Sequence, residues 1–567
     1  MKERKVVIDN IRWERVQFFV EGRFLDGEFS SPEFYLRNLD ESKVMTANEV
    51  NIKGDKFSAR FSLSNVNNGN YLPEDDYLIV VEDEYTYIAQ VSETLLDMSK
   101  LELTNEEQET LNEIIELGDE STLHNFVLSY YGKEFRRSGT SNSTVYTVTP
   151  MLSTEVNEFI LSVSFEQPKE KLDFYEATMK NIRRNYNKAS FSIRDFIFHL
   201  IFNWSKYKNK NNTKDVLFTS DSRAEMSGNF EYIFREMIRQ DKDKKYNIHQ
   251  QFKRHITDRR NFFDKFKFPY LLGKAKYIFV DDFHPMIYRV NFRKDQEIIQ
   301  VWHAVGTFKT FGYSRVGKSG GNFFNTRSHR NYTKVYVSAD NDIPYYAEAF
   351  GIKESNVIPT GVPRTDIFFN DKYEKKVTTE LYSIYPQIKD KQVILFAPTF
   401  RGNGHNSAYY PFFKIDFAKL AKYCEESNSV VLFKMHPFVR NKLKFPKKYN
   451  KYFIDVSNYR EVNNILFITD ILISDYSSLV YEFSLFKKPM LFYAYDLEDY
   501  VSKRDFYETY TDFVPGKIVQ DFDELITSLY NKDFEEEKIT DFINKHFKYT
   551  DGRSSERLVD DVFNKHQ

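Results

Sequence analysis

The feature that most constrains the fold is an alternation, from Val216 onward, of short apolar runs with longer helical stretches. Continuous apolar runs of this length are typical of strands buried on both faces of a parallel sheet. The alternation occurs in two sets, separated by a polar helical stretch around residues 373–391. It predicts an α/β fold with two Rossmann-like domains. The runs are DVLFTS, YIFVDD, IIQVWH, KVYVS and NVIPTG, then QVILFAPTF, VVLFKMHP, YFIDV, ILISDYSS and PMLFYA.

Polar residues follow many of these runs directly. Open parallel sheets bind ligands beyond the carboxyl ends of their strands, so these residues are the first candidates for a site. They are Ser220, Asp221, Arg223, Asp281, Asp282, His284, His303, Thr360, Gly361, Arg364, Thr399, Arg401, His436 and the segment 474–478.

Residues 1–168 show a different pattern, in which apolar and polar positions alternate within short runs such as VQFFVEGRF and KFSARFSLS. This pattern predicts an antiparallel β domain, interrupted by a polar helix near residues 105–117. The domain is either a packing module or a site for the acceptor, because a fold does not by itself give a function.

Residues 169–214 combine helical periodicity, an apolar segment (FSIRDFIFHLIFNW) and clustered basic residues. Such a helix suits an anionic membrane surface, where each basic residue contributes about 1 kcal/mol. A helix between domains with a solvated basic face is the alternative. The basic residues are Arg183, Arg184, Lys188, Lys206, Lys208, Lys210 and Lys214.

No run in the sequence is long enough to anchor the chain in a bilayer. The longest apolar candidate, residues 196–204, is less than half of the roughly 20 residues needed to cross. The amino terminus has no apolar run of signal-peptide length. We therefore expect a peripheral protein at the cytoplasmic face of the membrane.

The composition excludes several classes of function. Lys and Arg number 80 against 83 Asp and Glu, and the net charge of −3 gives no bulk attraction to nucleic acid. The single cysteine, Cys424, excludes an intramolecular disulfide and fits a reducing compartment. The motifs GxxxxGK[ST], HExxH and CxxC are absent, and Asp281 with Asp282 makes no complete metal site. We predict neither a cofactor nor a metal requirement.

The predicted organisation is therefore a β-rich domain over residues 1–168, a basic helical linker over 169–214, and Rossmann-like domains over 215–375 and 376–567. The second of these includes a carboxyl-terminal helix.

His303 is the first candidate for chemistry. It follows the run IIQVW and precedes Gly306, Thr307 and Lys309, which we assign with Arg364 to the acceptor or to the pocket. An imidazole with an ordinary pKa of about 6.5 can serve as general base for a hydroxyl nucleophile. A hydrogen-bonded core histidine is the alternative for a lone residue of this kind.

His436 follows the run VVLFKM and precedes Pro437, from the opposite domain. Its N–H could donate to a pyrophosphate oxygen across the cleft, although a His-Pro turn alone is also common.

The segment 475–478 (DYSS) joins a strand to a helix. Asp475, Ser477 and Ser478 therefore lie where free backbone N–H groups and hydroxyls form an anion site. An ordinary helix cap is the alternative. Glu482, further along that helix, can accept from ribose hydroxyls, and Arg401 with the loop 402–405 can supply a phosphate-binding cation.

These motifs resemble the CDP-glycerol glycerophosphotransferase family of wall teichoic acid enzymes, from about Val216 to the carboxyl terminus. The segments that carry the resemblance are QVWHAVGTFKTFG, PTGVPRTD, ILFAPTFRGNG, FKMHPF, LISDYSSLVYEF, KKPMLFY, RDFY and FVPGKIV. The stretches YIAQ, KEFRR, VYTVTP and VLFTSDSRAEMSGNFEYI are similar to the ribitol-phosphate polymerase branch.

The resemblance implies a GT-B fold in which the first Rossmann-like domain handles a lipid-linked teichoic acid acceptor and the second binds a CDP-alditol. It implies that His303 is the catalytic base, that His436 lies near the donor pyrophosphate, and that Ser477 and Ser478 contact phosphate. Many members read WHGTP where this chain has residues 302–306 as WHAVG, so the base is kept and the pocket beside it is bulkier.

The sequence leaves more than one function open. The sequence favours ribitol phosphate transfer from CDP-ribitol, with CMP as product, through the resemblance alone. Transfer from CDP-glycerol is the first alternative. A nucleotide-sugar glycosyltransferase or a non-catalytic polymer-binding protein is the second.

Overall fold

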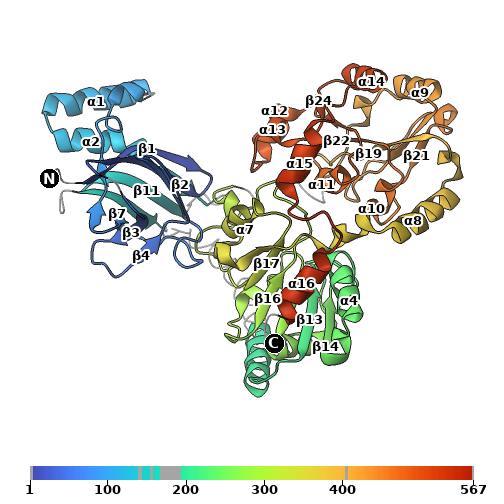
Figure 1. Ribbon diagram of the computed structural model, residues 1–567, viewed down its shortest axis with the longest axis horizontal. Coiled ribbons are helices and arrows are strands. Elements are labelled where there is room, and N and C mark those ends of the chain that lie inside the picture. The colour runs from blue at the N-terminus through green and yellow to red at the C-terminus, as the bar shows by residue number, and fades with distance from the viewer. Residues whose placement is uncertain are drawn as a thin grey trace, which may run out of the picture.

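The computed structural model describes residues 4–27, 29–101, 103–137, 144–153, 158–166, 193–318, 320–402 and 407–564. Two antiparallel-type sheets come first in the chain, and two parallel sheets with helices follow (Figure 1). We refer to these parts as the N-terminal β region (residues 5–166), the first α/β unit (strands β13 to β18) and the second α/β unit (strands β19 to β24).

The N-terminal β region contains a five-stranded sheet in the order β5-β6-β2-β1-β9, with all pairs antiparallel except β1 with β9. A seven-stranded sheet has the order β10-β11-β12-β7-β3-β4, with β8 paired to β7. The strands are β1 (Lys5–Glu14), β2 (Gln17–Leu25), β3 (Glu33–Asn38), β4 (Val44–Thr46), β5 (Glu49–Lys53), β6 (Lys56–Ser62), β7 (Asp75–Glu82), β8 (Thr86–Ile88), β9 (Gln90–Val91), β10 (Lys133–Arg136), β11 (Val145–Leu152) and β12 (Phe159–Glu166).

Two helices interrupt these strands, α1 (Asn105–Leu117) and α2 (Glu120–Ser129). The first coincides with the predicted polar helix. It begins at a capping box, in which Thr104 and Glu107 satisfy each other's backbone N–H groups. It ends at Gly118, whose φ of 69° is the left-handed conformation that stops a helix.

The first α/β unit is built on a parallel sheet in the order β14-β13-β15-β16-β17-β18. Its central strands are the apolar runs that the sequence identifies. The polar edge strand β14 has no such run and was not predicted, because an edge strand faces solvent and needs no continuous apolar pattern. The strands are β13 (Asp215–Ser220), β14 (Asn247–Phe252), β15 (Tyr277–Val280), β16 (Glu297–Gln300), β17 (Lys334–Val337) and β18 (Val357–Pro359).

The second α/β unit has a parallel sheet in the order β21-β20-β19-β22-β23-β24, which is the strand order of the Rossmann fold. The strands are β19 (Gln392–Phe396), β20 (Ser429–Phe433), β21 (Phe453–Asp455), β22 (Ile471–Ser474), β23 (Met490–Tyr493) and β24 (Lys517–Val519).

Helices connect and cover both parallel sheets (Figure 1). They are α4 (Asn229–Arg239), α5 (Lys242–Lys245), α6 (Asp264–Lys274), α7 (Asp342–Phe350), α8 (Asp371–Ile384), α9 (Phe417–Glu426), α10 (Val462–Leu466), α11 (Leu479–Ser484), α12 (Leu497–Lys503), α13 (Tyr510–Phe513), α14 (Phe522–Asn531), α15 (Lys538–His546) and α16 (Ser554–Phe563).

The carboxyl-terminal helix α16 returns to the first α/β unit. Its buried residues Leu558, Val559 and Val562 share a core with Val216 and Phe279 of strands β13 and β15. The sequence analysis grouped this helix with residues 376–567, since chain order does not reveal which sheet a helix covers.

A helix over residues 193–208 packs on the first α/β unit. Phe198 and Phe202 are buried beside Leu271 and Leu272 of α6. Of the basic residues predicted around this segment, Arg183, Arg184 and Lys188 lie outside the described residues. Within the described residues, no helix has the length and apolar character needed to cross a membrane.

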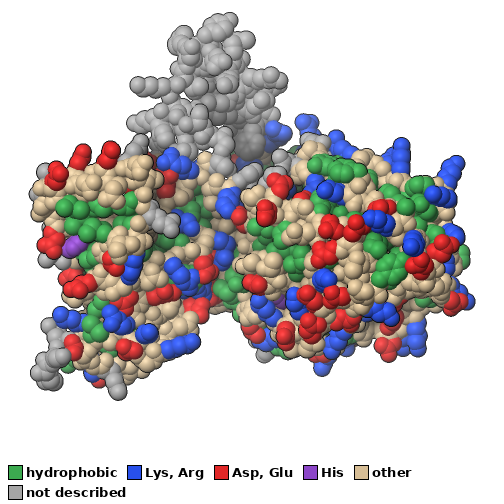
Figure 2. All heavy atoms as spheres, turned by 90° about the horizontal axis from the view of Figure 1, so that it is seen from above, with side chains coloured by type: hydrophobic (Ala, Val, Ile, Leu, Met, Phe, Trp, Pro, Cys, Tyr) green, Lys and Arg blue, Asp and Glu red, His purple; other side chains and the backbone are tan. Residues whose placement is uncertain are grey.

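The surface carries both signs of charge. On the face seen in Figure 2, acidic and basic side chains are interspersed over the large lobes, with apolar patches between them. Recognition of an anion on this face therefore depends on local arrangements of side chains.

The N-terminal β region and the first α/β unit share a hydrophobic core. Tyr313, Phe323 and Phe324 of the first α/β unit belong to the same buried cluster as Phe135 and Tyr146 of strands β10 and β11. The rings of Phe324 and Tyr146 lie 4.3 Å apart, centre to centre. The two parts are therefore packed as one body.

Buried charge reinforces this junction. The fully buried Glu348 of α7 accepts hydrogen bonds from Arg15 Nε at 2.8 Å and from Gln17 Nε2 at 2.5 Å. An unpaired carboxylate there would carry a large desolvation cost, so the β region satisfies a charge of the first α/β unit.

Phe324→Ala tests this junction. The substitution removes a fully buried ring, and we expect a loss of about 3 to 5 kcal/mol of stability and a clearly lower melting temperature. Phe413→Ala, at a ring that is 84% exposed, is the matched control and should melt like the wild type. Equal melting temperatures for the two variants would show that the junction contributes little.

Candidate functional site

A cleft of about 750 Å³ lies between the two α/β units, where the carboxyl ends of their strands face each other. In the second unit, the strand order reverses between β19 and β22, and the residues that follow these two strands line the cleft. This is the position at which open parallel sheets bind ligands. The predicted residues that line it are Arg223, Arg364, Thr399, His436, Ser477, Ser478 and Glu482.

His303 emerges from a strained turn after β16. Trp302, the residue before it, has a φ of 42°, a left-handed conformation that is costly for a bulky side chain. Asn229, at the start of α4, holds the turn by donating to the carbonyls of Val301 and Trp302, both at 2.9 Å. The turn directs His303 away from the sheet, and its side chain is 48% exposed.

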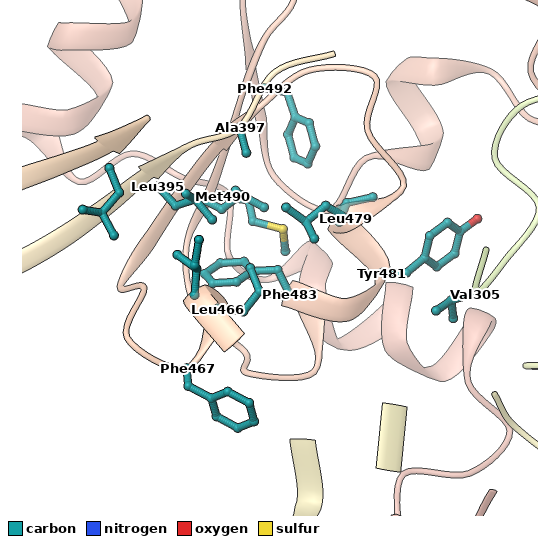
Figure 3. Close-up of a cluster of buried hydrophobic side chains, with 14 of the residues drawn as sticks. Val305, Leu395, Ala397, Leu466, Phe467, Leu479, Tyr481, Phe483, Met490 and Phe492 are labelled. Atoms are coloured by element: carbon teal, nitrogen blue, oxygen red, sulfur yellow. The ribbon is translucent and has the colours of Figure 1, made fainter. Parts of the chain in front are cut away.

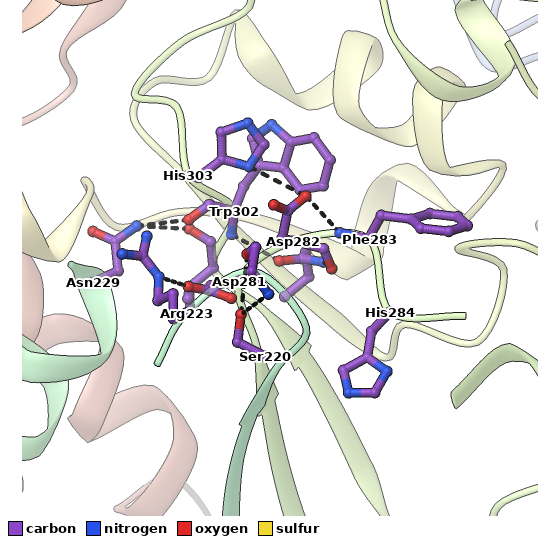
Figure 4. A network of polar contacts seen from close by, with 12 residues as sticks. Ser220, Arg223, Asn229, Asp281, Asp282, Phe283, His284, Trp302 and His303 are labelled. Atoms are coloured by element: carbon purple, nitrogen blue, oxygen red, sulfur yellow. Dashed lines mark hydrogen bonds and ion pairs between the residues drawn. The ribbon is translucent and has the colours of Figure 1, made fainter. Parts of the chain in front are cut away.

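The His303 imidazole has two close neighbours. Its Nδ1 lies 3.5 Å from Asp282 Oδ1, and its ring lies 4.5 Å from the ring of Trp302 (Figure 4). His303 is therefore not the buried, hydrogen-bonded core histidine that was the alternative.

Arg364 connects His303 to the second α/β unit. Its Nη1 donates to the His303 carbonyl at 2.5 Å, and its Nη2 donates to Glu482 of α11. The Arg364 backbone N–H also donates to Asn229 Oδ1 at 3.0 Å. Glu482 is 2% exposed, and its second oxygen, Oε2, has no hydrogen-bond partner. An ion pair thus crosses the cleft beside the proposed base.

His436 stands on the opposite side, beyond β20. The backbone N–H of Phe438 donates to its Nδ1 at 3.1 Å, so the neutral ring carries its proton on Nε2. Partial burial, with help from Lys434 and Lys309, lowers the pKa of His436 and favours this neutral form. The ring is then suited to donate a hydrogen bond to an anion.

Ser477 and Ser478 lie at the beginning of α11 and line the cleft. The Ser477 hydroxyl accepts from the Leu479 N–H at 3.2 Å, whereas Ser478 makes no side-chain cap. The predicted alternative, a helix cap, therefore describes Ser477 in part and does not describe Ser478.

Arg401 and Asp475, predicted as phosphate-binding groups, bind each other. Arg401 Nη1 lies 3.0 Å from Asp475 Oδ2, and its Nε and Nη2 donate to Asp496. Asp475 Oδ1 accepts from the backbone N–H of Thr399 at 2.7 Å. Both charges are buried and paired with each other, so these two side chains stabilise the loops beneath the cleft. Their direct contact with phosphate stays a prediction, and residues 403–405 of the adjacent loop lie outside the described residues.

The loop after His303 packs against the second α/β unit. Val305 is fully buried in the same apolar cluster as Leu479, Phe483 and Tyr481 (Figure 3). A Cβ at Gly306 would lie 2.4 Å from the Tyr481 ring, so only glycine fits there. The bulkier residues of WHAVG were expected to line the pocket. In the structure, Val305 instead packs into the core between the two units.

Thr307 and Lys309 also have partners in the protein. Thr307 is 2% exposed and donates to Asp342 Oδ1 at 3.0 Å. Lys309 Nζ donates to the Tyr500 hydroxyl at 2.9 Å. Their contact with an acceptor stays a prediction.

Sequence reasoning missed three groups in or beside the cleft. Asn229 fixes the turn before His303, and Lys434 lines the cleft beside His436. Arg460 of the second unit forms an ion pair with Glu225 of the first unit, at a distance of 2.5 Å. Asn229 and Arg460 lie in helical or loop stretches with no strand-end signal. Lys434 follows β20 directly, and reading every strand-end residue equally could have identified it.

The part of the chain that the structure describes contains no group of three or more His, Cys, Asp or Glu side chains arranged to hold a metal ion. The absence of a metal requirement stays a prediction.

The model of the family described as CDP-Glycerol:Poly(glycerophosphate) glycerophosphotransferase matches residues 201–564. The chain is 57% identical over 563 residues to the teichoic acid ribitol-phosphate polymerase TarL of Staphylococcus aureus, which covers 99% of this chain and 100% of that protein. It is 55% identical to TarK of the same organism, over 91% of this chain and 100% of the relative.

Solved structures share the fold. The wall teichoic acid polymerase TagF superposes with a TM-score of 0.54 at 22% identity, covering 69% of this chain and 98% of that one. The strand orders and the cleft place the protein among α/β proteins in which two parallel sheets face a common cleft. The chain belongs to the CDP-glycerol:poly(glycerophosphate) glycerophosphotransferase family.

Asp342, beneath the loop that carries Thr307, gives a pH prediction. Burial raises the pKa of its carboxyl to about 7. The unfolded carboxyl loses its proton near pH 4, so between about pH 4 and 7 the folded state binds the extra proton. The stability of the folded state therefore falls by about 4 kcal/mol as the pH rises from about 4, the unfolded pKa, to about 7, the folded pKa.

We therefore expect the wild type to lose more stability than Asp342→Asn between pH 5 and pH 8, measured by denaturant unfolding. Asp340→Asn, at a carboxylate that is 61% exposed, should follow the wild type. Parallel pH profiles for wild type and Asp342→Asn would refute the raised pKa.

Proposed function

We propose that this chain transfers ribitol phosphate from CDP-ribitol to the free end of a lipid-linked poly(ribitol phosphate) acceptor and releases CMP. The proposal rests on family membership and on relatives that are named ribitol-phosphate polymerases over the full length of the chain. The observation that carries the chemistry is the cleft. Its lining includes His436, Ser477 and Ser478 from the second unit and Arg364 from the first. His303 is not in the lining itself and adjoins it through Arg364, which donates to the His303 carbonyl.

The reaction needs a base on one side of a phosphorus atom and charge stabilisation on the other. In our proposal, His303 removes the proton of the terminal ribitol hydroxyl, and the oxygen attacks the phosphorus that bears the donor ribitol. The bond from that phosphorus to the bridging oxygen breaks, and this oxygen leaves as part of CMP. The proton remains on His303 until solvent accepts it.

His436 supports the departure of CMP in this scheme. Its Nε2–H can donate to a pyrophosphate oxygen, and the Ser477 and Ser478 hydroxyls lie on the same wall. Preorganised donors stabilise developing charge more than water does, because they need no reorientation during the reaction.

We also propose that the two α/β units form a GT-B arrangement, with the donor held by the second unit. The strand order of this unit and its switch point between β19 and β22 support the assignment. Glu482 Oε2, which is buried without a partner, is a candidate acceptor for a ribose hydroxyl.

His303→Ala is the central test. We expect turnover to fall about 100- to 10,000-fold, the usual contribution of a general base, while CDP-ribitol binding is kept. CMP release with purified acceptor measures the first quantity, and calorimetric titration measures the second. His124→Ala, in the N-terminal β region, is the matched control.

Near-normal turnover of His303→Ala would remove the proposed base.

Substrate screening tests the function itself. Greater CMP release from CDP-glycerol than from CDP-ribitol would favour the glycerol alternative, and UDP release from a nucleotide sugar would favour a glycosyltransferase.

We further propose that the helix over residues 193–208 lies on an anionic membrane at the cytoplasmic face. One side of this helix is exposed and apolar. Lysines at 206, 208 and 210 flank the patch. Such a surface combines apolar burial with attraction to anionic lipid. The exposed side chains are Ile193, Phe196, Ile197, Leu200, Trp204 and Tyr207.

The triple variant Phe196→Ser, Leu200→Ser, Trp204→Ser tests membrane contact. We expect at least about tenfold weaker cosedimentation with phosphatidylglycerol vesicles, because three apolar side chains no longer enter the interface. Phe413→Ser is the matched control at an exposed ring far along the chain. Equal cosedimentation of the two variants would exclude this helix as the contact.

A further inference from the structure

Two successive carboxylates directly follow strand β15, and they face different partners. Asp281 is fully buried and pairs with Arg223, whereas the side chain of Asp282 is 29% exposed and faces His303 (Figure 4). This opposite orientation is expected of neighbouring residues at the end of a strand, because side chains alternate between the two faces. One acid therefore supports a cation and the other adjoins the proposed base.

Asp282 is held in place by the backbone. Its Oδ1 accepts a hydrogen bond from the N–H of Phe283 at 2.7 Å and lies 3.5 Å from His303 Nδ1. The second distance is an ion-pair distance and exceeds that of an ordinary hydrogen bond. Catalytic hydrogen bonds are often long without substrate and shorten when it binds.

The rest of the His303 surroundings limits how the residue can move. The Trp302 ring lies against the imidazole, and Arg364 holds the His303 carbonyl. Arg364 is itself paired with Glu482, and Arg223 is paired with Asp281. Among these charged groups, Asp282 is the carboxylate that approaches a ring nitrogen of His303 within ion-pair distance.

A carboxylate only accepts hydrogen bonds. Its approach to Nδ1 therefore favours the tautomer that carries the proton on Nδ1 and leaves the lone pair on Nε2. His436 has the opposite arrangement, since the Phe438 N–H donates to its Nδ1. His303 and His436 are thus set up for different tasks, His303 to accept a proton at Nε2 and His436 to donate from Nε2.

We propose that Asp282 is a positioning residue for His303, which fixes the Nδ1–H tautomer and aims Nε2 at the acceptor hydroxyl. This inference rests on the proposed function, because it assigns a partner to the proposed base. During proton transfer, Nε2 gains the proton of the hydroxyl, and the Asp282 carboxylate stabilises the resulting imidazolium without itself taking a proton.

The test compares Asp282→Asn and Asp282→Ala with the wild type. We expect kcat to fall at least about 10-fold in both, by analogy with the carboxylates that orient metal-binding imidazoles. The KM for CDP-ribitol and the melting temperature should change little, because Asp282 does not line the donor wall. Asp243→Asn, at an exposed position of α5 in the same unit, is the matched control.

A double-mutant cycle separates positioning from a general structural effect. If Asp282 acts through His303, adding Asp282→Asn to His303→Ala should change the residual turnover by less than about twofold. A purely structural role would reduce turnover by a similar factor in both backgrounds.

Several outcomes would overturn the inference. Wild-type kcat in Asp282→Asn, or equal losses with and without His303, would show that Asp282 does not position the base. A lowered melting temperature together with weakened CDP-ribitol binding would show a structural role. Near-normal turnover of His303→Ala would remove the proposed base, and this inference with it. Loss of turnover in His303→Ala but not in Asp282→Asn would refute only the positioning role of Asp282.

Discussion

One segment, residues 302–324, is packed into three hydrophobic cores. Trp302 belongs to the core of the first α/β unit, Val305 and Phe308 to that of the second, and Phe323 and Phe324 to that of the N-terminal β region. Protein interiors are close-packed, so a displacement of this segment would disturb all three. Because His303 lies at its beginning, the position of the proposed base is determined by the packing of the whole molecule.

Ion pairs around the cleft hold its walls. Arg364 with Glu482 and Arg460 with Glu225 connect the two α/β units, while Arg401 with Asp475 lies beneath the cleft, within the second unit. The Arg364–Glu482 and Arg401–Asp475 pairs are largely buried, and buried pairs often add little net stability but fix geometry. The Arg460–Glu225 pair is exposed and contributes little. Because these charged side chains are already paired, donors outside the pairs, such as His436 and Ser478, are the groups in the lining of the second unit that can donate to a diphosphate.

Elements with a strong pattern of apolar and polar residues could be predicted from the sequence, and elements without one could not. Central strands such as β16 and β22 were found because burial on both faces demands continuous apolar residues, and α1 was found from its polar helical pattern. The edge strand β14 and the short strand β24 lack that signal. The roles expected of Arg401 and Thr307 assumed free side chains, and sequence spacing cannot reveal partners such as Asp496 and Asp342.

The sequence by itself determined the α/β class, the strand ends that carry polar residues and, through its motifs, the family. These properties depend on local patterns of burial and on residues a few positions apart. Tertiary structure alone decided that α16 covers the first sheet, that Gly306 must admit the Tyr481 ring, and that Asp282 faces His303. Each of these depends on the approach of segments distant in the chain, which packing sets and local sequence does not encode.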